Sequence, residues 1–440
     1  MKKRVKEYLS KFQQMIAFET ISSLEDNDLK KFKKFHKLLK ELFPNVFAKC
    51  KVEDFNGSLL FRWKGKSADE PILFMNHHDV VEATGDWKYP PFSATVAEGK
   101  LWGRGTLDTK GGLFAMLQAA DELIANGFVP EHDIYFESAC NEEVSGAGAD
   151  EISNEMIKRG IKFKYLVDEG GMIVEEPMKG VNGKYAMIGV AERGRASLKF
   201  VAKSNGGHAS TPGKDTPLVR LGKMMAYMEN HNVFKVEVSD VIVEMLKRLS
   251  THMSGPLAYV YGHADSFRPL LKVVMPSVSE TAKAMTQTTL AFTMAHGSGA
   301  ANVLPESAYV IGDMRTSHHE GFEGSLEAVK KVAEKFDVTV EVLESAVESN
   351  VADFNDYGFR LAEEAVKASY GDEISSAPYI MNQCSDARYM ARVCDCCLRF
   401  SPLSITNDQM HTIHGIDENV DIENLDKAVD FYSYMFKNSK

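Results

Sequence analysis

The feature that most constrains this chain is a series of short buried runs that are each followed by acidic or histidine side chains. Residues 72–75, 134–139 and 165–167 are apolar enough to lie inside a sheet. The polar residues that follow these three runs closely are His77, His78, Asp79, Glu142, Glu143 and Asp168. His77 and Asp79 stand two positions apart, so on an extended chain their side chains point to the same face.

Amphipathic segments between these runs indicate how the strands are connected. Residues 112–126 repeat apolar side chains at helical spacing, including Leu113, Leu117 and Leu123, and Gly127 follows as a helix-ending residue. Strands that alternate with helices predict an α/β sheet that is at least partly parallel. In such sheets ligands bind at the carboxyl ends of the strands. We therefore expect the acids and histidines to gather at one rim.

The pattern changes after about residue 190, and it predicts a second domain. The chain has 440 residues, which is more than a single hydrophobic core normally supports. Between residues 197 and 343 the order is strand, helix, strand, strand, helix, strand, as in a ferredoxin-like (βαββαβ) domain. We predict an α/β catalytic domain made of residues 1–190 and 348–440. A lid and dimerisation domain, residues 191–347, is inserted between these two parts.

Charge and hydropathy exclude two classes of partner. The net charge of −11 argues against nucleic acid, because phosphate contacts require a basic surface. No segment reaches the long uncharged run of a membrane-spanning helix. The basic start, residues 1–4, is not followed by the apolar run of a signal peptide. We therefore expect no nucleic-acid partner, no membrane association and a cytoplasmic location.

The predicted rim carries a chemical problem that a cation would solve. Several carboxylates at one sheet edge repel one another strongly unless a positive charge lies between them. Zinc accepts histidine nitrogen and carboxylate oxygen, and two zinc ions can share a bridging carboxylate. The glycine-rich loop 103–112 holds Asp108 just before the predicted helix. A single His-x-Asp pair or Glu-Glu pair is more often an ordinary surface feature, so only their combination indicates a metal site.

Several motifs in this order resemble a known family, the dizinc metallopeptidases that include aminoacylase, acetylornithine deacetylase and carboxypeptidase S. The chain is most similar to carboxypeptidase S and related N-acyl-amino-acid hydrolases. The matching stretches are HHDVV (77–81), GKLWGRGTLDTKGG (99–112), NEEVSGAGA (141–149), LVDEGG (166–171), GGHASTP (206–212), ANVLPESAYVIGDMR (301–315), SDAR (385–388) and HGIDE (414–418). The resemblance implies a zinc-peptidase-like catalytic domain with the inserted lid.

The resemblance also implies a ligand set for two Zn²⁺ ions per subunit, with Co²⁺ or Mn²⁺ as substitutes. His77 and Asp168 would bind one ion, Glu143 and His414 the other, and Asp108 would bridge both. Two further catalytic residues follow from the same resemblance. Asp79 would fix the tautomer of His77, and Glu142 would be the general base.

Three residues of the predicted lid are implied to act on the substrate. His208 would stabilise the developing oxyanion in the partner subunit's site, which implies a homodimer. Arg315 would pair with a free carboxylate of the substrate, and Asn302 would hydrogen-bond its carbonyl. Without the resemblance, we would interpret His208 as an ordinary loop residue and Arg315 as a charged residue at a strand edge.

These observations predict a hydrolase that cleaves the amide bond of a dipeptide or short peptide bearing a free carboxylate. The alternative enzyme is an N-acyl-amino-acid deacylase, because both reactions pass through the same tetrahedral intermediate. A non-catalytic binding protein is the remaining alternative, and it predicts loss of a ligand or of the base. The loop Asn382-Gln383-Cys384 departs from the glycines of the family, which leaves the substrate open.

Overall fold

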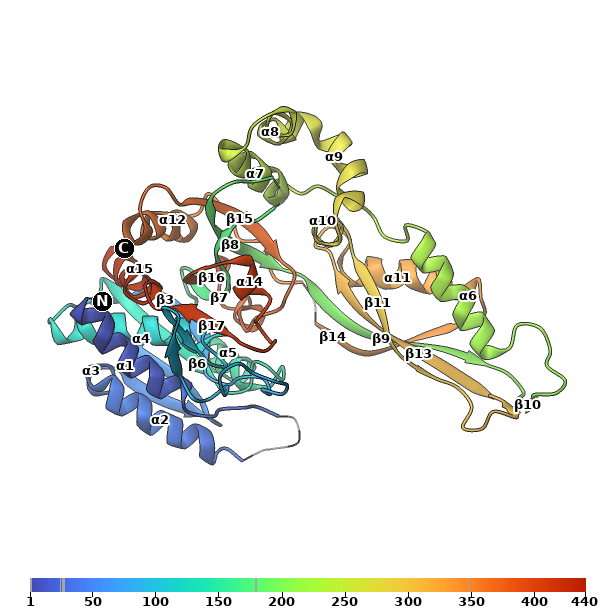
Figure 1. The fold of residues 1–440 in the computed structure, drawn as a ribbon, viewed down its shortest axis with the longest axis horizontal. Helices are drawn as coiled ribbons and strands as arrows, with labels where there is room; N and C mark the ends of the chain where they lie inside the picture. Colours follow the sequence, from blue (N-terminus) through green and yellow to red (C-terminus); the bar gives the residue numbers. More distant parts are fainter. Residues whose placement is uncertain (1, 24, 26–27, 179, 347) are drawn as a thin grey trace.

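The two larger sheets of the chain lie at opposite ends of an elongated molecule (Figure 1). The computed structural model describes residues 2–23, 25, 28–178, 180–346 and 348–440. The larger sheet has the strand order β1-β2-β6-β3-β7-β16-β8-β15. Its strands are β1 (Lys51–Phe55), β2 (Ser58–Trp63), β3 (Ser67–His77), β6 (His132–Ala139), β7 (Leu166–Glu175), β8 (Lys184–Glu192), β15 (Ser375–Met381) and β16 (Cys397–Ile405).

The centre of the large sheet is parallel, as the alternation of strands and helices predicts. β3 pairs in parallel with both β6 and β7, and β7 pairs in parallel with β16. Side chains on one face join a large core with several helices, and those on the other face join a smaller core. The first core includes α1 (Lys3–Ile16), α4 (Lys110–Ala125), α12 (Tyr357–Tyr370) and α15 (Asn424–Asn438), and the second includes α5 (Gly148–Lys158) and α13 (Ala387–Met390).

β6 ends at Ala139, as the sequence predicts, whereas β3 extends beyond Met75 to His77 and β7 is longer than expected. The buried run was expected to end at Val167, but the strand continues to Glu175. Its pairing with β16 shifts register after Asp168, so Asp168 stands at an irregularity and not at a strand end. Gly171 lets the continued strand lie against β8, because a Cβ there would lie 1.9 Å from the Met187 carbonyl oxygen. The glycines thus permit a close approach of two strands.

The smaller sheet is built from residues 194–346 and has the order β11-β13-β9-β14, with all neighbouring strands antiparallel. α6 and α11 pack on one face of it around buried residues such as Phe200 and Val329. The other face is largely exposed along β11 and β14. The elements are β9 (Gly194–Lys203), α6 (Pro217–Asn230), β11 (Thr289–His296), β13 (Ser307–Thr316), α11 (Gly321–Glu334) and β14 (Thr339–Ala346).

A helical segment between α6 and β11 belongs to the large core although it lies within the expected lid. Its first helix packs against β15, and Ile242 and Leu246 join the large hydrophobic cluster. The expected boundary at residue 347 lies outside the described residues. The segment consists of α7 (Asp240–Leu249), η1 (Ser250–His252), α8 (Pro256–Gly262), α9 (Ala264–Val278) and α10 (Glu280–Thr286).

The remaining elements are short and border the two sheets. A small antiparallel sheet has the order β17-β5-β4, and β10 pairs with β12 at the far tip of the smaller sheet (Figure 1). Among the described residues no helix is both long and apolar enough to cross a membrane. These elements are α2 (Lys30–Leu42), α3 (Pro44–Lys49), β4 (Thr95–Ala97), β5 (Lys100–Trp102), β10 (Gly207–His208), β12 (Val303–Leu304), α14 (Asn407–Met410) and β17 (Asn419–Asp421).

Candidate metal centre

His77 is the last residue of β3, and both of its ring nitrogens have partners. Its side chain is buried, with Nε2 lying 3.0 Å from Asp108 Oδ1. Nδ1 lies 3.0 Å from the main-chain oxygen of Asp79 and 3.4 Å from Asp79 Oδ1. The expected contact with Asp79 is therefore made chiefly through its carbonyl. Both contacts fix the orientation of the ring at the rim.

Asp108 presents one oxygen to each of two histidines. Oδ1 faces His77 and Oδ2 lies 3.0 Å from His414 Nε2. The loop that carries Asp108 turns at Gly105, whose φ of 87° lies in the region that favours glycine. At Gly112, the third residue of α4, a Cβ would lie 2.1 Å from Asn76 Oδ1. The glycines of this loop therefore bring Asp108 close to the end of β3.

The glycine-rich loop is held by Glu418, a residue whose role the sequence patterns do not reveal. Its buried carboxylate accepts hydrogen bonds from the main-chain N–H of Leu107 at 2.7 Å and of Asp108 at 3.2 Å. It also pairs with the buried guanidinium of Arg104 at 2.9 Å. Its place in HGIDE, four residues after His414, was the only available signal. Glu418 thus links the loop of Asp108 to the segment of His414.

Glu143 and His414 complete the cluster around Asp108. Glu143 Oε2 lies 3.0 Å from His414 Nε2, and His414 adopts a left-handed backbone with a φ of 59°. Ligand atoms of His77, Asp108 and Glu143 lie within 4.8 Å of one another. Glu143 Oε1 is buried without a hydrogen-bond partner among the described residues. A buried carboxylate oxygen that lacks a partner, beside imidazole nitrogens, fits a divalent cation.

The carboxylate of Asp79 also anchors the loop that carries the two glutamates. Oδ1 accepts from the main-chain N–H of Glu142 at 3.3 Å, and Oδ2 accepts from that of Glu143 at 3.1 Å. Ser22 donates a further hydrogen bond to Oδ2 at 2.6 Å. Asp79 therefore positions both glutamates in addition to supporting His77. The resemblance implied only the support of His77, and the hydrogen bonds to the two glutamates were not expected.

Asp168 and Glu142 line a cavity next to His77, but the structure does not include Asp168 in the compact cluster. The oxygens of Asp168 accept from the main-chain N–H groups of Glu169 at 2.8 Å and Ala387 at 2.7 Å. Asp386, from the SDAR stretch, lines the same cavity. Glu137 does so as well, and both of its oxygens lack hydrogen-bond partners among the described residues. Neither Asp386 nor Glu137 was singled out from the sequence.

The cluster holds more negative charge than its neighbours neutralise. Burial raises the pKa of Glu142 well above its usual value, and repulsion by Asp386 and Glu143 adds to this effect. Burial acts in the same direction on Asp108, but hydrogen bonds from His414 and His77 hold its pKa below the usual range. Hydrogen bonds to Asp108 and Glu143 raise the pKa of His414 to about 10. A protonated His414 thus supplies positive charge beside Asp108 and Glu143, and a bound cation would supply that charge instead.

Two of the three residues expected on the substrate, His208 and Asn302, lie at the tip of the smaller sheet, away from this cluster within one chain. His208 is exposed on β10 at the tip of the smaller sheet, and its Nδ1 contacts Ser210 Oγ at 2.7 Å (Figure 1). Asn302 lies beside it, since its main-chain oxygen accepts from Ala209 at 3.0 Å. Arg315 lies near the other end of β13, with Nε donating to Asp313 at 2.7 Å. The structure therefore pairs His208 with Asn302 and separates both from Arg315.

A cluster of imidazole and carboxylate groups at the carboxyl edge of an α/β sheet is typical of a metal-dependent hydrolase. Residues 73–438 match the peptidase family M20/M25/M40. This chain belongs to that family, and it is accordingly a hydrolase of amide bonds. The predicted resemblance to dizinc metallopeptidases of this group is thereby confirmed at the level of the family.

Known proteins similar to this chain extend over almost its whole length. A probable carboxypeptidase S-like 2 from Dictyostelium discoideum is 29% identical over 96% of this chain and 83% of its own length. The human N-fatty-acyl-amino acid synthase/hydrolase PM20D1 is 27% identical over 95% of this chain and 84% of its own length. These relatives include both enzyme types that the sequence left open.

Solved structures share the fold at low sequence identity. An M20 family metallo-carboxypeptidase from Sulfolobus solfataricus covers 99% of both chains with a TM-score of 0.72 and 16% identity. Human carnosine dipeptidase 1 covers 98% of this chain and 96% of its own, with a TM-score of 0.66 and 15% identity. These likenesses confirm the mixed α/β architecture of this chain.

Proposed function

We propose that the protein is a two-zinc hydrolase that cleaves the amide bond of a dipeptide or short peptide with a free carboxylate. The observation that carries the proposal is the placement of Asp108, whose two oxygens each lie 3.0 Å from a different histidine. A carboxylate that faces two imidazoles in this way suits a bridge between two cations. The proposed ligands are His77, Asp108, Glu143, Asp168 and His414, with Co²⁺ or Mn²⁺ as substitute metals.

The proposed reaction is attack of water on the scissile carbonyl. Bound zinc supplies Lewis acidity, which polarises that carbonyl and lowers the pKa of water. Glu142 removes a proton from the attacking water and returns it to the leaving nitrogen, since its carboxylate lines the cavity beside His77. Asp79 holds Glu142 through its main-chain N–H at 3.3 Å. The raised pKa of Glu142 favours a group that both accepts and returns a proton.

The smaller sheet is proposed as a ferredoxin-like lid and dimerisation domain. Its βαββαβ order and its exposed face support this assignment. His208 and Asn302 lie at its tip, so in a homodimer they would reach the site of the partner subunit. Arg315 would bind the substrate carboxylate from within its own chain. We assign α7–α10 to the catalytic domain because α7 packs on β15. For the rest of the chain we keep the predicted domain boundaries.

An N-acyl-amino-acid hydrolase is the second candidate, and the similarity to PM20D1 over 95% of this chain favours it. The experiment that separates the two is a panel of kcat/KM values on the zinc-loaded enzyme. Matched substrates would share one C-terminal residue and carry an aminoacyl, an acetyl or a long acyl group. The peptidase proposal expects the aminoacyl substrates to have the largest kcat/KM. Preference for acyl substrates by more than about tenfold would replace it with the deacylase.

A binding protein without catalysis remains a third possibility, and metal analysis separates it from both enzymes. We expect two zinc ions per chain in protein purified without chelators. Well under one ion per chain, together with no turnover on the substrate panel, would contradict the hydrolase. The expected ligand and base residue types are all present in the chain. The absence of nucleic-acid and membrane partners and the cytoplasmic location stay predictions.

A further inference from the structure

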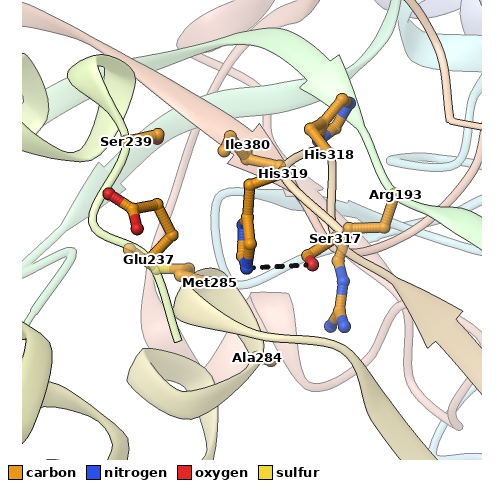
Figure 2. A pocket seen from close by; sticks show the side chains of 9 residues that line it. All are labelled: Arg193, Glu237, Ser239, Ala284, Met285, Ser317, His318, His319 and Ile380. Atoms are coloured by element: carbon orange, nitrogen blue, oxygen red, sulfur yellow. Dashed lines mark hydrogen bonds between the residues drawn. The ribbon is translucent and has the colours of Figure 1, made fainter. Parts of the chain in front are cut away.

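A second cavity lies at the junction between the two sheets, apart from the metal centre. Its volume is about 210 Å³. Segments from both sheets and from the helical insertion surround it (Figure 2). Its lining residues come from the β8–β9 link, the segment before α7, α10, the loop after β13, and β15: Arg193, Glu237, Ser239, Ala284, Met285, Ser317, His318, His319 and Ile380.

The guanidinium of Arg193 lines this cavity and is buried without an ion-pair partner among the described residues. The residue is 3% exposed, and Nε has no hydrogen-bond partner among the described residues. Nη2 donates only to uncharged oxygens, at 2.9 Å to Gln287 and 3.2 Å to Thr289, with a further contact to the Arg315 carbonyl. Burial lowers the pKa of Arg193 to about 10, and Arg315 adds repulsion. The group is therefore still a cation at neutral pH.

Two other buried arginines show what Arg193 lacks. Arg104 pairs with the buried carboxylate of Glu418 at 2.9 Å. Arg399 pairs with the buried carboxylate of Glu192 at 3.2 Å. Arg193 has no such ion pair among the described residues, although an unpaired buried charge costs several kcal/mol. The contrast indicates that the counter-ion of Arg193 comes from outside the chain.

The other polar groups around the cavity do not supply that counter-ion. Glu237 pairs with Lys272 at 3.0 Å and is partly exposed. His319 Nε2 donates to the main-chain oxygen of Lys235 at 2.8 Å and also lies 3.3 Å from Ser317 Oγ, a contact that Figure 2 marks. His318 points away from this pair, and burial lowers its pKa to about 4, so it carries no charge at neutral pH. The hydroxyl of Ser317 therefore adds a neutral donor near a cation.

We propose that this junction cavity binds a small oxyanion, a phosphate or a carboxylate, with Arg193 as its counter-ion. Arg193 Nε and Ser317 Oγ donate to the anion. A volume of about 210 Å³ accommodates such an ion together with some of its water. Because segments of both sheets line the cavity, the bound anion connects them. Binding therefore restrains the smaller sheet relative to the larger one.

The test measures anion binding to the metal-loaded enzyme by calorimetry at constant ionic strength. Inorganic phosphate and acetate are titrated separately, so that the two arms identify which oxyanion the cavity prefers. Ala284→Leu fills the cavity from α10 without changing a charge, and Arg193→Met removes the cation. Thr281→Leu, at an exposed position of the same helix, is the matched control. None of these residues belongs to the proposed catalytic machinery.

We expect the Kd of the preferred anion to rise about tenfold or more in Ala284→Leu and in Arg193→Met. Thr281→Leu should leave it unchanged. Phosphate that binds at the metal centre instead would keep its Kd in Ala284→Leu, and that result would overturn the proposal. So would a Kd above about 10 mM for both anions in the unaltered enzyme. If Arg193→Met fails to fold, Ala284→Leu decides the question alone.

Discussion

The rim of the large sheet and the tip of the smaller sheet carry the two sets of proposed catalytic groups, and they are built differently. At the rim His77 is 2% exposed, and the carboxylates of Asp79 and Glu418 are held by main-chain donors. At the tip His208 is exposed, and its imidazole forms hydrogen bonds only with Ser210 among the described residues. The groups at the rim are preorganised by contacts within their own chain, whereas His208 at the tip lies on the surface of the molecule. The proposed homodimer would join them.

Glu142→Gln should have the largest effect because it removes the proposed base from the preorganised rim. We expect kcat to fall by about 10³- to 10⁴-fold, since an amide cannot take a proton from water. Zinc content should stay at the level of the unaltered enzyme, because the ligand set is untouched. Steady-state kinetics and elemental analysis of the same sample measure both quantities. A parallel loss of zinc and turnover would mean that Glu142 is a ligand.

Glu418→Ala tests whether the rim depends on its buried anchor. The change leaves the Arg104 guanidinium buried without its partner, which typically costs about 3–5 kcal/mol of unfolding free energy. It also frees the N–H groups of Leu107 and Asp108 from their acceptor. Chemical denaturation of metal-free protein isolates this contribution from that of bound zinc.

Glu98→Ala is the matched control for that measurement, because Glu98 forms an exposed pair with Lys88 at 2.6 Å. Exposed pairs contribute at most about 1 kcal/mol. Equal stability of the two variants would show that Glu418 does not hold the loop. The comparison between a preorganised rim and an exposed tip would then lose its main support.

His208→Ala tests the other side of the comparison, the tip. We expect kcat to fall by about 10²- to 10³-fold if His208 stabilises the oxyanion. Refolding it with an equal amount of Glu142→Gln chains should restore activity, because each mixed dimer has one site with both groups intact. About a quarter of the activity of the unaltered enzyme is expected for random pairing in a two-fold dimer. Mixed dimers that form and stay inactive would count against a shared site.

Local patterns predicted the strands, the helices and several rim residues because these depend on spacing along the chain. His77 and Glu143 follow buried runs, and a parallel sheet brings such ends together. The predicted extent of β7 was wrong because Gly170 and Gly171 interrupt the buried run without ending the strand. In the structure they allow an irregular register and a close approach to β8.

The anchoring contacts were not predictable because they join distant parts of the sequence. The Arg104–Glu418 pair spans 314 positions, and the hydrogen bond from Glu142 to Asp79 spans 63. Burial and partner choice at such separations follow from tertiary packing, which periodicity does not encode. His414 shows the same limit. Only its motif predicted it, whereas its left-handed backbone and its contacts with Asp108 and Glu143 appear only in the fold.

Ser210→Ala should have the smallest effect on kcat, and it tests how strongly the tip orients His208. The hydroxyl of Ser210 lies 2.7 Å from His208 Nδ1 and is one of two contacts that orient the ring. Loss of one exposed hydrogen bond is worth about 1 kcal/mol, so we expect kcat to fall only about fivefold. The melting temperature and zinc content should not change, because no part of the rim is altered. Ser93→Ala, another exposed serine hydroxyl, is the matched control. A drop in kcat as large as that of His208→Ala would show that the tip is preorganised as strongly as the rim.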